Sequence, residues 1–221
     1  MTEHQQNLNR RNFLQYVSKA AIILPLAGLG AMELSSCASG GSLFARQSLA
    51  NGSNSKAPWK ISLVSDQEPG EPLIISGTIY APDGHTALEG INLWVYQTDA
   101  TGHYSTLRES GGDNRNTRLH GLMQTNHKGE YEFRTIKPAS YPGHTIPAHI
   151  HAYVSGPGYP EYWIDEFLFA GDPFITDEMR QKARGQGSFS SILTLQRGSD
   201  GVWRGSRNIQ VERCSRNCTG R

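Results

Sequence analysis

Cysteine is scarce in this sequence, with only 3 among 221 residues. Small secreted domains that rely on a disulfide framework need more cysteines, so the sequence excludes that class. Charge of one sign is also lacking, since 21 Lys and Arg stand against 20 Asp and Glu. A net charge of +1 provides no basic field for nucleic acid, and no nucleic-acid partner is expected. The 37% of hydrophobic residues indicates a globular chain rather than a disordered one.

A long hydrophobic run is absent as well. The apolar stretch over residues 20–32 is too short to span a bilayer comfortably and is typical of an export signal. Arg10 and Arg11 precede it and are similar to a twin-arginine signal, although a Sec signal with two basic residues is the alternative. Residues 34–37 end in Cys37 and resemble a lipobox, whose cysteine is acylated; a chance cysteine near a cleavage site is the alternative. The prediction is an exported protein, periplasmic or tethered to the membrane outside the cytoplasm through Cys37.

These features divide the chain into four parts. Residues 1–36 are the predicted export signal with its lipobox, and residues 37–57 are rich in Gly, Ser, Asn and Ala, as is typical of a flexible tether. Residues 58–211 form the predicted domain, and residues 212–221 form a basic tail. The tail contains Cys214 and Cys218, which an oxidising compartment would allow to form a disulfide, although the sequence does not decide whether they do.

The domain is dominated by short segments rich in β-branched and aromatic residues, separated by turn signals. The predicted strands cover residues 61–64, 73–80, 91–98, 131–135, 149–154, 162–169, 191–195 and 202–211. One helix is expected over residues 176–183, with Thr176 as its N-cap and Asp177 and Glu178 in its first turn. The pattern predicts an all-β fold: an antiparallel β-sandwich with long loops and at most one or two short helices.

Two histidines stand out within this pattern. His149 and His151 are two residues apart, so on a strand both imidazoles point to the same face. Such a pair is a natural beginning of a metal site, although two surface histidines are the alternative. Imidazole suits iron, zinc, copper and nickel alike, so the pair does not identify the metal.

The surrounding motifs resemble the core of the intradiol ring-cleavage dioxygenases. The most specific are Tyr141, followed by the block from Pro147 to His151 with the sequence Pro-Ala-His-Ile-His, and the Gly-x-Tyr of residues 102–104. The segments 88–105, 124–142 and 167–173 extend the similarity to roughly residues 73–173, about half of the chain.

The resemblance implies a β-sandwich that holds one non-haem ferric ion, Fe(3+). Carried over by motif, the metal ligands are Tyr104, Tyr141, His149 and His151. It also implies a catecholic substrate and O2 as partners, with the ring opened between its two hydroxylated carbons. Tyr104 would be released from the metal and act as the base for a catechol proton. Catalytic roles are therefore assigned to Tyr104 and, at the position of a glutamine common in the family, to Glu166.

The sequence departs from the family pattern near these residues. Ile146 stands where ring-cleaving members commonly have an arginine, and Glu166 replaces the glutamine. His144, close to Tyr141, is expected in a loop that helps to line the pocket. Two alternatives therefore stay open: an iron-binding sandwich without ring cleavage, and a transthyretin-like or adhesion-type binding module. The substrate is not identified, and the neutral surface permits homo-oligomers without requiring them.

Overall fold

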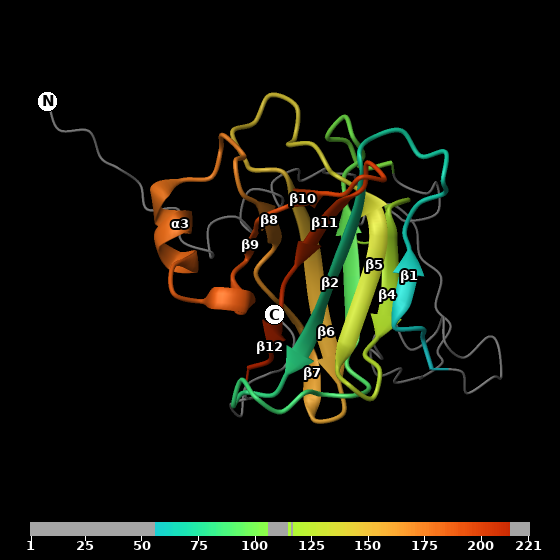
Figure 1. Ribbon diagram of the computed structural model, residues 1–221, viewed down its shortest axis with the longest axis vertical. Coiled ribbons are helices and arrows are strands. Elements are labelled where there is room, and N and C mark those ends of the chain that lie inside the picture. The colour runs from blue at the N-terminus through green and yellow to red at the C-terminus, as the bar shows by residue number, and fades with distance from the viewer. Residues whose placement is uncertain (1–55, 106–114, 116, 213–221) are drawn as a thin grey trace, which may run out of the picture. The chain divides into compact units, whose positions relative to one another are not determined.

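The computed structural model describes residues 56–105, 115 and 117–212 (Figure 1). The predicted export signal, the tether up to residue 55, and Cys214 and Cys218 lie outside these residues. Within the described part of the chain, no helix has the length and apolar character needed to cross a membrane.

In the described part of the chain, twelve strands form two sheets. The members of the first are β1 (Lys60–Ser62), β2 (Pro72–Tyr80), β5 (Glu130–Ile136), β10 (Gln196–Arg197), β11 (Trp203–Ser206) and β12 (Ile209–Gln210). They follow the order β1-β5-β2-β11-β10, and β12 also pairs with β2. The members of the second are β3 (Asn92–Gln97), β4 (His120–Gln124), β6 (His149–Gly156), β7 (Tyr159–Trp163), β8 (Phe167–Phe169) and β9 (Ile192–Leu193). Their order is β4-β3-β6-β8-β9, with β7 paired to β6.

The core lies between the inner faces of the two sheets, and Figure 1 shows β2 and β5 of the first sheet in front of β6 of the second. In β6, Ile150, Ala152 and Val154 are fully buried in this core. Because side chains alternate along a strand, His149 and His151 point to the opposite, outer face of the second sheet. The pleat of β6 thus places both imidazoles outside the hydrophobic core.

Within residues 56–105, 115 and 117–212, two short helical elements occur, the α-helix α3 (Asp177–Ala183) and the 3-10 helix η2 (Gly187–Phe189). Figure 1 shows α3 beside the edge formed by β8 and β9. The Thr176 side chain accepts a hydrogen bond from the Met179 amide at 3.2 Å, as predicted for an N-cap. Lys182 Nζ lies 2.9 Å from the Asp165 carboxylate, which connects α3 to the segment before β8.

The predicted all-β sandwich is confirmed, with a difference in strand pairing. The β1–β5, β2–β11, β2–β12 and β8–β9 pairs are parallel, so both sheets are mixed rather than wholly antiparallel. Two predicted strands are interrupted, at residues 164–166 and at residues 207–208. The sequence analysis missed β4 and β10, and a glycine and polar residues conceal the β4 pattern. A Cβ atom at Gly121 would lie 2.5 Å from Ile61 Cδ1 and 2.6 Å from Leu63 Cδ2, so a larger residue would require these two side-chain ends to move.

Candidate metal centre

The four predicted metal ligands lie together on the outer face of the second sheet. Tyr104 Oη is 2.7 Å from Tyr141 Oη and 2.9 Å from His151 Nε2. Tyr141 Oη is 3.0 Å from His149 Nε2 and 3.2 Å from His151 Nε2. The two Nε2 atoms are 3.0 Å apart. Two oxygen and two nitrogen atoms therefore converge, although the residues that carry them span 47 positions of the sequence.

The two tyrosines come from loops that are held against each other. Thr98 Oγ1 donates a hydrogen bond to the Ala139 carbonyl at 2.9 Å, and the Ala139 amide donates to the Asp99 carbonyl at 3.1 Å. Gly102 has a φ of +83°, and a Cβ atom there would lie 2.0 Å from the Ser140 carbonyl oxygen. The glycine of the Gly-x-Tyr motif thus allows the loop before Tyr104 to approach the loop before Tyr141.

The side chain of Asp172 fixes the segment that leads into β6. Asp172 follows Gly171 beyond β8, and its Oδ2 accepts a hydrogen bond from the Ala148 amide at 2.9 Å. Its Oδ1 accepts from the Phe174 amide at 2.9 Å, which holds its own turn in place. The downstream Gly-Asp-Pro motif therefore positions the strand start that carries His149.

The hydrogen bonds of the histidines indicate which ring nitrogens are unprotonated and direct a lone pair at the cluster. His149 Nδ1 lies 2.7 Å from the Pro147 carbonyl oxygen, which can only accept, so Nδ1 carries the proton and donates it. His149 Nε2 is then a lone-pair nitrogen directed at the cluster. His151 Nδ1 is buried without a hydrogen-bond partner among the described residues, and Glu166 Oε1 lies 3.9 Å from it.

The cluster contains too few protons to make all of its contacts as hydrogen bonds. Each phenol can donate one proton, His149 Nε2 has none and His151 Nε2 has at most one, yet five contacts lie between 2.7 and 3.2 Å. Donor atoms about 3 Å apart are typical of ligands around one metal ion with bonds of about 2 Å. The donor set therefore fits a cation, and phenolate oxygens with imidazole nitrogens suit iron.

Burial affects the protonation of three of these groups. It raises the pKa of the Tyr104 phenol, and the hydrogen bond with Tyr141 and the Glu166 charge raise it further. Burial also raises the pKa of Tyr141. It lowers the pKa of His151 to about 3, with a smaller contribution from His149. At neutral pH His151 is therefore uncharged and able to offer a lone pair, while both phenols need a nearby cation to ionise.

Aromatic side chains that the sequence analysis did not single out surround His151. The Tyr96 ring stacks on His151 with centroids 4.6 Å apart, and the Trp163 ring meets it edge-on at 4.8 Å. Tyr153 lies 4.9 Å from Trp163, which is 42% exposed and forms the rim of the site. Their place beside His151 follows from the strand register, because Tyr96 pairs with His151 and Trp163 pairs with Tyr153. That register would have identified them from the sequence only if the strand pairing had been known.

The remaining predicted residues lie around the cluster rather than in it. The His144 ring is 6.2 Å from the Tyr141 ring, in the loop where it was expected. Ile146, at the position of the family arginine, is 37% exposed and offers no charge or hydrogen bond. The Glu166 carboxylate lies beside the outer nitrogen of His151. The structure thus brings the four predicted ligands together and places Glu166 behind one of them.

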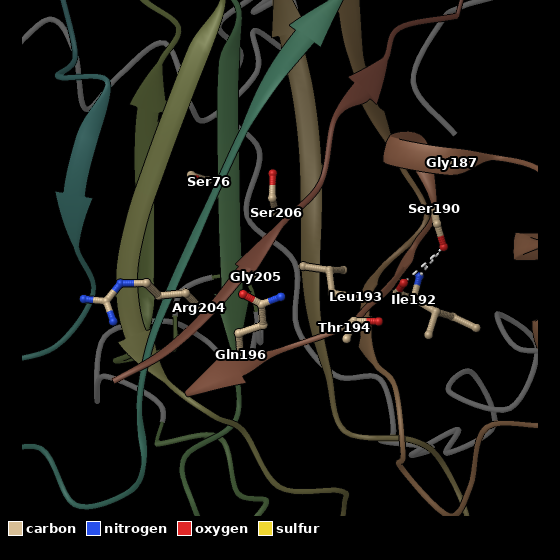
Figure 2. Close-up of a pocket in the computed structure, with 10 residues that line it drawn as sticks. All are labelled: Ser76, Gly187, Ser190, Ile192, Leu193, Thr194, Gln196, Arg204, Gly205 and Ser206. Carbon is tan, nitrogen blue, oxygen red and sulfur yellow. Dashed lines mark hydrogen bonds between the residues drawn. The ribbon is translucent and has the colours of Figure 1, made fainter. Parts of the chain in front are cut away.

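A separate hollow of about 420 Å³ is lined mainly by residues in and around β9, β10 and β11 and by none of the cluster residues (Figure 2). Its lining is mostly small and polar, including Ser76, Thr194 and Gln196. Arg204 at its edge is paired with Asp200 at 2.6 Å. The hollow has no group of acids, bases or metal ligands, so the tyrosine and histidine cluster is the better candidate site.

Comparisons with known proteins show what the chain is similar to. A family model described as "Dioxygenase" matches residues 48–201. Catechol 1,2-dioxygenase 1 of Acinetobacter lwoffii is 30% identical over 141 residues, covering 57% of this chain and 44% of that protein. A chlorocatechol 1,2-dioxygenase of Cupriavidus pinatubonensis is 28% identical over 163 residues, covering 66% of this chain and 60% of that protein. The chain therefore spans about half the length of the curated relatives it matches.

Solved structures show the same fold at lower identity. The dioxygenase domain of a dioxygenase–carbohydrate-binding fusion protein from Streptomyces sp. SirexAA-E superposes with a TM-score of 0.54 at 24% identity, covering 73% of this chain and 92% of that one. Catechol 1,2-dioxygenase from Acinetobacter sp. ADP1 gives a TM-score of 0.54 at 19% identity, covering 72% of this chain and 59% of that one. The sandwich described above is thus shared with these proteins.

Proposed function

Because the chain belongs to the intradiol ring-cleaving dioxygenase family, as a divergent member, we propose that it cleaves a catechol-type ring between its two hydroxylated carbons with O2. Membership of this family removes the transthyretin-like or adhesion-type alternative. We propose Fe(3+) as the metal and Tyr104, Tyr141, His149 and His151 as its ligands. The observation that carries this proposal is the convergence of two phenols and two imidazoles with fewer protons than contacts.

When bound, ferric iron supplies Lewis acidity, which lowers the pKa of phenolic oxygens and activates a catechol ring towards O2. The protein supplies the donors in a rigid arrangement. β6 fixes both imidazoles, and the Pro147 carbonyl holds the His149 ring in the tautomer that directs its Nε2 lone pair inward. Such preorganisation means that the ligands need little rearrangement when the metal enters.

The two tyrosines are not equivalent, and this supports different roles for them. Among the described residues, Tyr141 Oη contacts Tyr104, His149 and His151, whereas Tyr104 Oη contacts Tyr141 and His151. Tyr104 thus has the smaller number of contacts to give up. We assign it the role of proton acceptor: its Oη takes a hydroxyl proton from the incoming catechol, while Tyr141 stays in place.

The aromatic wall suits a planar substrate. Trp163 at the rim presents its exposed ring beside the cluster, while the buried Tyr96 supports His151 from behind. Such surfaces pack against an aromatic ring and reduce the access of water to the reacting atoms. The exposed Ile146 takes the place of a charged group, so the pocket favours substrates without an acidic substituent there.

Oxygen uptake tests this function. The protein loaded with Fe(3+) should consume one O2 per catechol and yield the muconate-type diacid, which contains both oxygen atoms. Tyr141→Phe and Tyr80→Phe form a matched pair, because Tyr80 is a partly buried tyrosine on the first sheet that contacts Phe189. The first variant should lose turnover and the second should keep it. Turnover in the Tyr141→Phe variant equal to that of the Tyr80→Phe variant would contradict the ligand assignment.

The absence of an arginine at Ile146 favours one second candidate, an iron-binding sandwich without ring cleavage. The two candidates differ in one outcome. If added catechol shifts the colour of the iron-loaded protein but no O2 is consumed across a panel of catechols, the second candidate is correct.

We also propose that the protein works outside the cytoplasm, tethered through an acylated Cys37 at the end of the export signal. In cells, Cys37→Ala should move the protein from the membrane fraction to the soluble exported fraction. An unchanged membrane fraction would contradict the tether.

A further inference from the structure

The two histidines of the cluster differ in how their outer nitrogens are satisfied. If both Nε2 atoms face a metal, both Nδ1 atoms must carry a proton. His149 Nδ1 donates its proton to the Pro147 carbonyl at 2.7 Å. His151 Nδ1 is buried, and within the described part of the chain it has no hydrogen-bond partner. A buried N–H without an acceptor is unfavourable, so an acceptor is required close to His151.

Glu166 is the group in position to provide it. Its Oε1 lies 3.9 Å from His151 Nδ1, and the structure gives this carboxylate no hydrogen bond among the described residues. The side chain is 37% exposed and therefore has room to rotate. A movement of about 1 Å would bring the two atoms to hydrogen-bond distance.

The backbone of Glu166 is held from the other sheet. Arg207, in the connection between β11 and β12, donates from Nη1 to the Asp165 carbonyl at 2.7 Å and to the Glu166 carbonyl at 3.2 Å. Arg207 is only 5% exposed, and its guanidinium lies over the Phe167 ring at 4.8 Å. A buried cation thus fixes the segment from which the Glu166 side chain extends, so the carboxylate is anchored near His151.

We propose that Glu166 is a positioning residue whose carboxylate accepts the Nδ1 proton of His151, so that carboxylate, imidazole and metal form a triad with Arg207 holding its backbone. This rests on the proposed function, because it requires His151 Nε2 to face a metal. A carboxylate in this position fixes the orientation of the ring and makes the imidazole a stronger ligand. Glu166 therefore acts through His151 and does not need to touch the substrate.

Metal affinity is the first test, with Zn²⁺ as the probe and a competing chelator to set the free concentration. Glu166→Ala should bind Zn²⁺ about 10 to 100 times more weakly than the unchanged protein. Glu166→Gln should stay within about threefold, since its amide oxygen still accepts the proton. Glu161→Ala is the control, because Glu161 is similarly exposed at 40% and pairs with Arg115.

Three outcomes decide between the possibilities for this residue. Equal affinities of Glu166→Ala and Glu161→Ala would overturn the proposal. Equal losses in Glu166→Ala and Glu166→Gln would also overturn it, because charge alone would then matter and not an accepted proton. If the unchanged protein binds neither Zn²⁺ nor Fe(3+), the proposed function fails, which is a distinct result.

Nitrogen-15 NMR of the imidazoles in the Zn²⁺-loaded protein gives a second readout that folding alone would not change. Both histidines should show a proton on Nδ1. In Glu166→Ala the His151 Nδ1 proton should exchange with water faster, while the His149 proton, bonded to Pro147, serves as an internal control and should not change. A His151 proton located on Nε2, or an exchange rate unaffected by Glu166→Ala, would overturn the proposal.

Discussion

The outer faces of the two sheets are built on different principles. The first sheet presents exposed charged side chains in ion pairs, such as Lys60 with Glu132 at 3.3 Å and Arg134 with Asp66 at 3.3 Å. The second sheet, around β6, presents imidazoles and phenols covered by loops, with His149 only 9% exposed. The outer face of the first sheet exposes charged groups, which water solvates well. The outer face of the second sheet instead buries polar groups away from water.

The two faces contribute differently to the stability of the fold. Exposed ion pairs contribute little to stability and can be lost with little consequence. Buried polar groups with unmet hydrogen bonds are unfavourable for folding, so their presence indicates a site kept for chemistry. The covered face should therefore respond to mutation through metal binding, and the charged face should hardly respond at all.

His149→Ala should have the largest effect. It removes one of four donors, so iron content and ring-cleaving activity should fall by more than about 100-fold, beyond the losses typical of residues behind the ligands. The metal-free protein should lose about 1–3 kcal/mol of unfolding free energy, because the hydrogen bonds of His149 with Pro147 and Tyr141 disappear. Iron analysis and urea unfolding check the two parts. A variant that loses most of its stability but keeps its iron content per folded molecule would contradict this prediction, because His149 would then serve folding and not metal binding.

Arg207→Met should have the second-largest effect on stability and metal binding, because Arg207 connects the two sheets. Loss of the guanidinium leaves the Asp165 and Glu166 carbonyls without their donor, which should reduce the unfolding free energy by about 1–3 kcal/mol. Zn²⁺ affinity should fall in the same direction as in Glu166→Ala. Calorimetry measures the stability and chelator competition measures the Zn²⁺ affinity. An unchanged Zn²⁺ affinity would show that Arg207 does not support the metal site.

Gly102→Ala should come next, with Gly143→Ala as the matched control. Both glycines have a positive φ, +83° and +75°, so alanine adds a similar backbone strain of about 1 kcal/mol at each. Only at Gly102 does the added Cβ meet backbone, 2.0 Å from the Ser140 oxygen, whereas Gly143 has nothing within 4 Å. Gly102→Ala should therefore separate the tyrosine loops and weaken metal binding, and Gly143→Ala should not. Equal metal affinities in the two variants would contradict this role of Gly102.

Arg134→Ala on the charged face should have the smallest effect. Its pair with Asp66 is exposed, with 44% and 91% of the two side chains accessible, so the unfolding free energy should change by about 0–1 kcal/mol. Iron content should stay the same. A loss of iron in this variant would show that the two faces are coupled.

Local sequence patterns predicted the strands, and alternation along β6 predicted that His149 and His151 share a face. That Tyr104 and Tyr141 join them was implied only by the resemblance to the family, not by the local pattern. The parallel pairings could not be predicted, because they depend on how distant strands are ordered in a sheet. The proximity of Glu166 to His151 could not be predicted from the sequence either, because a buried arginine from the opposite sheet holds the backbone of Glu166 in place. Trp163 reaches the site only through its register opposite Tyr153.

We propose that two phenolates and two imidazoles of this chain bind one ferric ion. Resonance Raman spectroscopy of the iron-loaded protein tests it most directly, because excitation into the phenolate-to-iron charge-transfer band enhances only the vibrations of bound tyrosinates. The protein should be coloured and show two tyrosinate environments, of which Tyr104→Phe and Tyr141→Phe each remove one. A colourless iron-loaded protein, or tyrosinate vibrations that persist unchanged in both variants, would contradict the account.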